Sequence, residues 1–179
     1  VLHIGLRDAL TNAHELRVVQ DTIPIVEFGV YRLLTALVLD IFELAGPSEL
    51  AALMTKGLFD AHRVSDYFER WSDRFDLFDD RFPFLQTRDM IEDPQPIAGL
   101  LPSIPAGTNV THFHHAYEED FVIGPGQCAR LLTAIPCFMT MGGRGKSPSI
   151  NGAPPWYVLI TGDSLFETIC RNACVIPLP

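Results

Sequence analysis

Several features that define common protein classes are missing from this sequence. No apolar run approaches the roughly eighteen residues of a membrane-spanning helix, because the most apolar stretch, YRLLTALVLDIFEL, is interrupted by Arg32, Asp40 and Glu43. The chain starts with VLHIGLRD, which has neither the basic nor the apolar region of a secretory signal. We therefore expect a protein without a membrane span that works in the cytoplasm.

Cysteine is scarce, and no two cysteines form a CxxC pair. A chain of 179 residues is long enough to bury a core without a disulfide framework, so we expect reduced thiols. Because these cysteines lie on apolar helical patterns, we interpret them as core residues and not as nucleophiles. They are Cys128, Cys137, Cys170 and Cys174.

Complete catalytic signatures are also absent. Ser164 lacks a G-x-S-x-G elbow, and no HExxH motif occurs. The stretch MGGRGKSPSING, residues 141–152, resembles a phosphate-binding loop, but the first glycine of the pattern G-x-x-x-x-G-K-[ST] is replaced by Thr140. Pro148 and Pro154 also prevent the long helix that such a loop requires. We therefore do not predict a nucleotide site, and a flexible glycine turn is the plain alternative.

Basic residues are outnumbered, with 13 Lys and Arg against 22 Asp and Glu and a net charge of −9. The imbalance is uneven along the chain. Residues 1–120 hold 20 acidic and 9 basic residues, a balance of −11, whereas residues 121–179 have a balance of +2. The basic residues of the last third are Arg130, Arg144, Lys146 and Arg171. The sequence therefore predicts that only this last third can face an anion.

Apolar periodicity is abundant, with 47% hydrophobic residues, and it predicts a helical core. A short helix is expected from Leu6 to Ala13, and a central core helix is expected with Pro24 in its first turn. The apolar stripe of this second helix is Val30, Leu33, Leu34, Leu37, Val38, Ile41 and Phe42. A third helix is expected to start at a Ser48 cap and to stop near Gly57.

Three further helices are expected. Asp60 is predicted to cap the fourth, whose aromatic stripe we assign to the core. That stripe is Val64, Tyr67, Phe68, Trp71 and Phe75. A fifth helix is expected over residues 124–138 with a kink at Pro136, and a Ser164–Glu167 capping box predicts a last helix over LFETICRN.

Two other segments complete the expected fold. The apolar run WYVLIT, residues 156–161, predicts a short buried strand, followed by a turn at Gly162 and Asp163. From Phe82 to about Ile123 periodicity is almost absent, which is typical of a functional or mobile loop. The predicted fold class is α+β: a mixed, mostly helical globular domain with short strands and a long mobile loop region.

One histidine-rich cluster, THFHHAYEED at residues 111–120, leaves an alternative open. On a strand, His112 and His114 would share a face, and with Glu118 they form the donor set of a two-His one-carboxylate site for zinc or iron. A metal-dependent hydrolase follows from that interpretation. No second histidine cluster supplies further ligands, so we expect no metal and no cofactor.

The order of several blocks resembles the amino-terminal domain of the CasA family, the large subunits of the type I-E Cascade complex of bacterial CRISPR immunity. The blocks are GLRDALTNAHELRVVQDTIP, YRLLTALVLDIF, FDLFDDRFPFLQT, QCARLLTAIPCF, the GGRGKS loop and TGDSLFETICRN. The resemblance covers nearly all of residues 1–179. It implies that the chain is an amino-terminal domain of a longer polypeptide, and that the family's carboxy-terminal helical bundle, wedge and lysine finger lie after Pro179.

The resemblance also implies a non-enzymatic function. Members of the family recognise the protospacer-adjacent motif on duplex DNA, help to open the duplex for the guide RNA, and recruit a helicase-nuclease. The expected partners are therefore that DNA, the other Cascade subunits with their guide RNA, and the helicase-nuclease.

Site residues follow from the same resemblance. The family's glycine loop, which lies against the DNA minor groove, matches Gly142, Gly143, Arg144 and Gly145, with Lys146 beside them. Arg144 departs from the more glycine-rich loop of some members and could add a phosphate contact. The family's loop that docks on the complex matches HFHHAYEED, centred on Phe113, His114 and His115. Cys128 has no CxxC partner for the structural zinc that some members carry.

Overall fold

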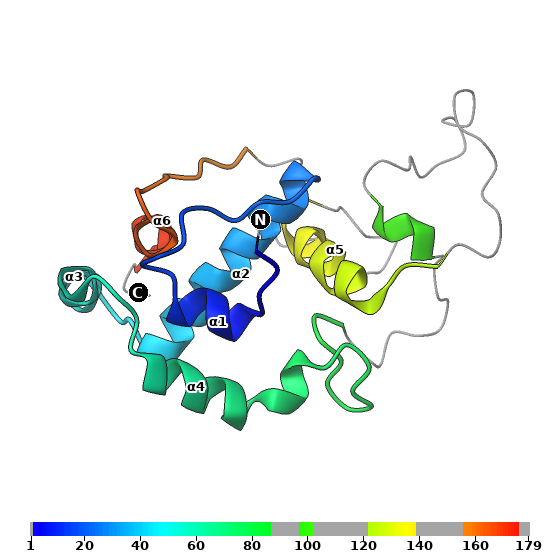
Figure 1. Ribbon diagram of the computed structural model, residues 1–179, viewed down its shortest axis with the longest axis horizontal. Coiled ribbons are helices and arrows are strands. Elements are labelled where there is room, and N and C mark those ends of the chain that lie inside the picture. Colours follow the sequence, from blue (N-terminus) through cyan, green and yellow to red (C-terminus); the bar gives the residue numbers. More distant parts are fainter. Residues whose placement is uncertain (1, 87–96, 102–121, 139–155, 176–179) are drawn as a thin grey trace.

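One long helix, α2 (Pro24–Phe42), is the element on which the other helices pack. The computed structural model describes residues 2–86, 97–101, 122–138 and 156–175. Within these ranges every regular element is a helix, and none is a strand. The predicted α+β class is therefore wrong for the described part of the chain, which is helical (Figure 1). Within that part, no helix combines the length and apolarity needed to cross a membrane.

The prediction of α2 as the central core helix is confirmed. Pro24 occupies the first turn, where its missing N–H is harmless, and the helix ends at Glu43 in the left-handed conformation with φ 50°. Its buried residues are Val26, Gly29, Tyr31, Leu34, Thr35, Leu37, Val38 and Ile41. Because they lie on several sides of the helix, α2 contacts neighbours on more than one face.

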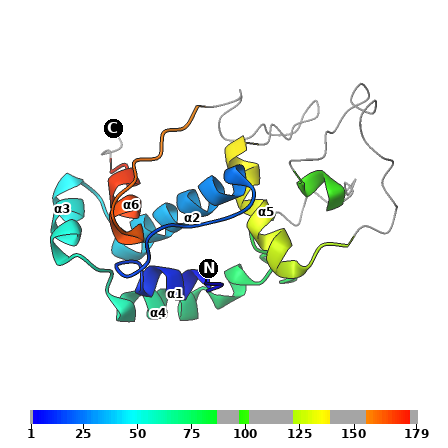
Figure 2. The ribbon, with the colours of Figure 1, turned by 45° about the horizontal axis from the view of Figure 1, so that its top comes forward.

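Four helices pack around the carboxy-terminal half of α2. They are α1 (Leu6–Thr11), α3 (Pro47–Lys56), α4 (Ala61–Arg70) and α6 (Leu165–Asn172). In both views α1 and α4 lie side by side beneath α2, and α3 lies next to α6 (Figures 1 and 2). This first core contains the fully buried Leu10, Leu34, Phe59, Val64 and Ile169. The backbone N–H groups of Leu165 and Phe166 donate to the carbonyl oxygens of residues 16 and 13, which ties the start of α6 to the segment after α1.

The amino-terminal half of α2 packs against α5 (Pro125–Phe138), the predicted fifth helix, which contains Pro136 as expected. Figure 2 shows α5 crossing α2 at the end opposite to α6. Val26, Ile123, Cys128, Leu131 and Ala134 form the buried part of this second core. The 3-10 helix η3 (Ile97–Leu100) lies beside α5.

The two helices α2 and α5 cross at Gly29. A Cβ atom built on Gly29 would lie 2.5 Å from the backbone oxygen of Thr133 and 2.7 Å from its Oγ1. Real Cβ atoms do not approach backbone this closely, so any side chain at Gly29 would push the helices apart. Thr133 is itself buried, and its hydroxyl donates to the carbonyl oxygen of Arg130 at 2.7 Å.

Most predicted helix boundaries are confirmed. Asp60 accepts hydrogen bonds from the backbone N–H groups of Arg63 and His62, and these two bonds hold the pKa of its carboxyl below the usual value. Gly57 ends α3 with φ 72°, a conformation that glycine adopts without strain. Ser164 caps α6 by accepting from the N–H of Glu167 at 3.2 Å.

One prediction about α3 is wrong, and one about α4 is confirmed only in part. The cap of α3 is Gly46 and not Ser48, because Pro47 already occupies the first helical position and places Ser48 inside the first turn. The aromatic stripe is buried only in part. Val64 is fully buried and Tyr67, Phe68 and Phe75 pack against the first core, but Trp71 is 39% exposed. Because α4 ends at Arg70 and Phe75 lies in the 3-10 helix η1 (Ser72–Phe75), the helical spacing does not continue to Trp71.

The strand predicted for WYVLIT is also wrong. Residues 156–160 have the side-chain alternation of a strand, with Trp156, Val158 and Ile160 exposed and the two residues between them half-buried. No partner strand lies beside them among the described residues, so no ladder forms. Instead, the side chain of Asn172 accepts the N–H of Ile160 at 3.0 Å and donates to its carbonyl oxygen at 2.8 Å.

We predict that replacing Gly29 with Ala destabilises the protein by about 1–3 kcal/mol, the usual cost of overpacking a tight contact. The added methyl group would overlap the Thr133 backbone. Gly126→Ala is the matched control, because Gly126 also lies in a helix of this pair and a Cβ there meets nothing within 4 Å. Denaturant unfolding measures both variants, and a Gly29→Ala midpoint equal to that of the parent would contradict the close crossing.

Candidate nucleic-acid interface

The structure describes the flanks of both candidate loops and not the loops themselves. Gly142, Gly143, Arg144, Gly145 and Lys146 lie outside the described residues. The docking residues Phe113, His114 and His115 lie outside them too, as do His112 and Glu118 of the alternative metal site. The described flanks fix where each segment leaves and rejoins the helical core.

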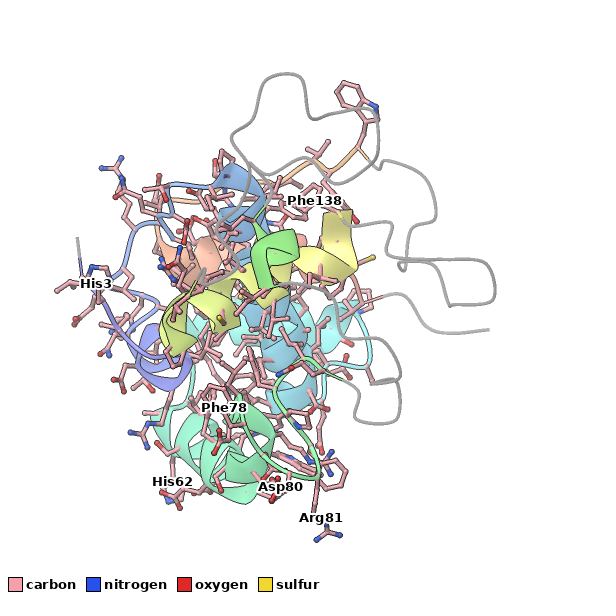
Figure 3. The ribbon with its side chains drawn as sticks, turned by 90° about the vertical axis from the view of Figure 1, so that its right-hand side faces the viewer. His3, His62, Phe78, Asp80, Arg81 and Phe138 are labelled. Atoms are coloured by element: carbon pink, nitrogen blue, oxygen red, sulfur yellow. The ribbon has the colours of Figure 1, made fainter. Side chains whose placement is uncertain are left out.

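Three aromatic rings join the two ends of the glycine-containing segment. Phe138 is the last residue of α5 and Tyr157 follows the segment, and their ring centroids lie 5.3 Å apart at an interplanar angle of 82°. Phe28 of α2 stacks on Tyr157 at 4.6 Å and meets Phe138 edge-on at 5.4 Å. The chain between Phe138 and Tyr157 therefore begins and ends at one place, next to the first half of α2. Figure 3 shows Phe138 at this end of the molecule.

Polar contacts reinforce this aromatic cluster. The Tyr157 hydroxyl donates to the carbonyl oxygen of Cys137 at 2.9 Å, in the last turn of α5, where Pro136 lies inside the helix. The guanidinium of Arg32 lies over the Tyr157 ring, 5.6 Å from its centroid. Burial raises the pKa of the Cys137 thiol, while the nearby Arg32 opposes that shift. Cys137 is therefore a packed neutral thiol and not a nucleophile.

Helix α6 holds the chain that leaves the aromatic cluster. Besides its two bonds to Ile160, the Asn172 amide donates to the carbonyl oxygen of Thr168 at 2.7 Å. Arg171 donates to the carbonyl oxygen of Thr161 at 2.9 Å, and the N–H of Gly162 donates to the Thr168 hydroxyl at 2.9 Å. The segment from Ile160 to Gly162 is thus fixed by side chains of one helix, although it belongs to no sheet among the described residues.

Apolar contacts fix the ends of the other candidate loop. Leu100 and Leu101 precede residues 102–121 and pack on the second core, and Ile123 follows them and is buried in it beside Val26. Ile123 lies just before α5, whereas Phe138 ends it. Ile123 and Phe138, one anchor from each segment, therefore lie at opposite ends of one helix of 14 residues, which is about 20 Å long.

Ion pairs change the charge that the sequence assigns to this region. Arg130 pairs with Asp21 at 2.8 Å, and Arg171 pairs with Glu167 at 3.0 Å. Two of the four basic residues in the last third are therefore neutralised, one of them by a carboxylate from the acidic first part. Arg32 comes from that acidic part as well, and no described carboxylate lies within 4.0 Å of it. The sequence did not point to Arg32, Phe28 or Tyr157, because only the crossing of α2 and α5 brings them together.

The cysteines are free thiols, as expected. Three are buried as predicted, and Cys174 is exposed because it lies after the end of α6. Burial, with Glu167 nearby, raises the pKa of Cys170 to about 11. Cys128 lies in the second core and donates to the carbonyl oxygen of Ile123 at 3.8 Å. Within the part that the structure describes, no group of three His, Cys, Asp or Glu residues converges as metal ligands do.

Comparison with known proteins decides the family. The model of the family described as CRISPR-associated protein Cse1 matches residues 2–178. This chain belongs to the Cse1 family. Its resemblance to CasA is thereby confirmed, since a curated relative from Thermus thermophilus, described as CRISPR-associated protein CasA/Cse1, is 34% identical over 182 residues. That match covers 96% of this chain and 36% of the relative, so the chain spans about a third of the relative's length.

Solved structures of Cse1 proteins share the fold. Thermus thermophilus CasA (Cse1) superposes with a TM-score of 0.67 at 29% identity, covering 95% of this chain and 35% of that one. One chain of a structure described as a CRISPR RNA-guided surveillance complex superposes with a TM-score of 0.72 at 25% identity. The match covers 94% of this chain and 38% of that chain. Thermobifida fusca Cse1 has a TM-score of 0.72 at 23% identity, a likeness of fold, covering 96% of this chain and 35% of that one.

We predict that Asn172→Asp releases the segment around Ile160. The new carboxyl group can still accept the Ile160 N–H, but when ionised it cannot donate, and it faces two carbonyl oxygens. The cost should be about 0.5–1.5 kcal/mol near neutral pH, the usual net worth of a hydrogen bond, because the Ile160 bonds are exposed to solvent. It should shrink as the pH falls toward about 4, because the protonated carboxyl group regains a donor. Asn12→Asp is the matched control, since Asn12 donates only to Asp8 within its own turn.

Thermal unfolding at two pH values and hydrogen exchange of the Ile160 amide measure this effect. Faster exchange at Ile160 is expected in the Asn172 variant alone. Equal exchange in both variants would show that Asn172 does not hold the segment.

We predict that the purified protein carries less than one zinc or iron ion per chain, measured by elemental analysis. One ion per chain that disappears in the His112→Ala, His114→Ala double variant would favour the metal-hydrolase interpretation instead. His62→Ala is the control, because His62 lies on α4, paired with Asp66 at 2.8 Å, outside that cluster.

Proposed function

We propose that this chain is the amino-terminal part of the non-catalytic large subunit of an RNA-guided CRISPR surveillance complex, acting in the cytoplasm without a cofactor. The observation that carries the proposal is the Cse1 family match, which runs from residue 2 to residue 178. The fold likeness to a chain of a surveillance complex supports it. In this role the other subunits of the complex and the guide RNA are the partners.

The segment with Gly142, Gly143 and Gly145 reads the protospacer-adjacent motif from the DNA minor groove. That groove is only about 6 Å wide, so a loop that enters it with its backbone needs residues without side chains. Arg144 and Lys146 supply positive charge for the flanking phosphates. The packed ring cluster of Phe28, Phe138 and Tyr157 supports this role, because it gives the segment a fixed base.

The segment with Phe113, His114 and His115 docks the subunit on the rest of the complex. One of its anchors, Ile123, lies just before α5, and the length of that helix, about 20 Å, separates it from the anchor of the glycine segment at Phe138. This spacing supports a division of labour, in which one end of α5 serves assembly and the other serves DNA. Duplex opening and recruitment of a helicase-nuclease then follow as functions of the complete subunit.

We predict that Gly143→Asp abolishes tight binding of motif-bearing duplex, because the new side chain adds bulk and negative charge against the groove. The assay uses the surveillance complex reassembled with the full-length subunit and compares duplexes with and without the motif at one fixed salt concentration. Gly126→Asp is the matched control. It adds the same side chain to the exposed first turn of α5, where a Cβ meets nothing within 4 Å and a carboxylate suits the helix dipole.

Loss of binding in the Gly143 variant with unchanged binding in the Gly126 variant is the expected result. If Gly143→Asp binds the motif-bearing duplex as tightly as the parent, residues 142–146 do not read DNA.

A further inference from the structure

A groove of about 280 Å³ lies between α2 and the chain that follows the glycine segment. Phe28, Arg32, Ala36 and Leu39 line it from α2, and Tyr157 faces them across it. Asn172 and Cys174 line it at the end of α6. All of its lining residues belong to the described part of the chain, so the groove is defined without the loop itself.

The charge of this groove is unusual for a chain with a net charge of −9. Arg32 is its one charged lining residue, and no Asp or Glu contributes to its wall. The residues three and four positions from Arg32 on α2 are Phe28, Gly29, Thr35 and Ala36, so no carboxylate on its own helix pairs with it. By contrast, the groove between α2 and α4 is lined by Asp40, Glu43 and Asp66 together with two arginines.

The other polar side chains of the groove are engaged within the protein. Both donor bonds of the Asn172 amide go to carbonyl oxygens, and the Tyr157 hydroxyl donates to Cys137. The Thr35 hydroxyl donates to the carbonyl oxygen of Tyr31 at 2.8 Å, and the Tyr31 hydroxyl accepts the N–H of Val19 at 2.9 Å. Apart from the Tyr31 hydroxyl, whose proton is not used in that bond, Arg32 offers the donors of this groove, and it is the one that carries positive charge.

The position of Arg32 over the Tyr157 ring suits it for an anion. An aromatic face orients a guanidinium without consuming its N–H groups, and the planar fork of arginine matches the oxygens of a phosphate. Tyr157 in turn is one of the three rings that join the ends of the glycine segment. Both ends of that segment are thus anchored beside Arg32, and we expect a duplex bound by the segment to pass near this groove.

We propose that Arg32 binds a backbone phosphate of the target duplex beside the glycine segment. This inference rests on the proposed function and adds to it a contact from the acidic part of the chain. The proposed ligand is a backbone phosphodiester of the DNA. The guide RNA also carries backbone phosphodiesters and is the alternative ligand. The test below separates these two sources.

Salt dependence identifies the contact. Each phosphate neutralised by a protein cation contributes about 0.9 to the slope of log affinity against log salt concentration. Arg32→Gln and Arg32→Met, in the reassembled complex with the full-length subunit, should weaken duplex binding several-fold and make this slope less steep by about 0.9. Arg32→Lys should keep the slope of the parent, because it keeps the charge.

Arg81→Gln is the matched control. Arg81 also lies over an aromatic ring, 5.7 Å from the centroid of Phe82, and its loss changes the net charge equally. Figure 3 shows Arg81 at the end of the molecule away from Phe138, so its replacement should leave the slope unchanged.

A slope for Arg32→Gln and Arg32→Met equal to that of the parent would overturn the proposal. This holds even if affinity falls, because Arg32 would then act only by positioning Tyr157.

The second measurement is the assembly of the subunit on the complex with guide RNA and without DNA. A changed salt slope there, and not with duplex, would assign the phosphate to RNA and overturn the proposal as well. Gly143→Asp distinguishes failure of this proposal from failure of the proposed function. If Gly143→Asp loses duplex binding while the Arg32 variants keep the salt slope of the parent, only the proposal for Arg32 fails and the proposed function stands.

Discussion

The contact between Gly29 of α2 and Thr133 of α5 determines where everything else on the candidate interface lies. It lets the two helices approach until backbone meets backbone, with the Thr133 oxygen 2.5 Å from where a Cβ of residue 29 would stand. Val26 lies one turn before Gly29 on α2 and shares a buried cluster with Ile123, which lies just before α5. Phe28 lies next to Gly29 on α2 and packs edge-on against Phe138 at the end of α5. The anchors of both candidate loops therefore depend on one crossing.

The sequence predicted well what local interactions decide. The caps at Asp60 and Ser164 and the stop at Gly57 were correct, since each depends on a few neighbouring residues and on the geometry of one helix end. It failed where distant residues decide. The alternation in WYVLIT is present, but a strand needs a partner, and here the backbone bonds of Ile160 go to the side chain of Asn172.

The candidate site illustrates the same limit in electrostatic terms. Counting charges along the chain gave the last third an excess of positive charge, yet Asp21 pairs with Arg130 across 109 positions, and its side chain is only 8% exposed. The same count placed Arg32 in the acidic part, although it lies over Tyr157 beside the end of α5. The interaction between two charges depends on their distance in space and not on their separation in the sequence. The electrostatics of the site therefore could not be predicted before the crossing of α2 and α5 was known.

An acidic chain is compatible with a DNA-facing role because its charges are separated. The segment after α4 contains Asp73 in η1 and then Asp76, Asp79 and Asp80, and Figure 3 shows Asp80 at the end of the molecule away from Phe138. The Debye length is about 10 Å at 0.1 M salt, so carboxylates farther than this from Arg32 act weakly on a phosphate beside it. Their effect is on orientation, because a duplex that came close to the acidic end would meet charge of its own sign. On the proposed function, the net charge of −9 therefore opposes an approach of DNA to the acidic end more strongly than an approach to the groove between α2 and Tyr157.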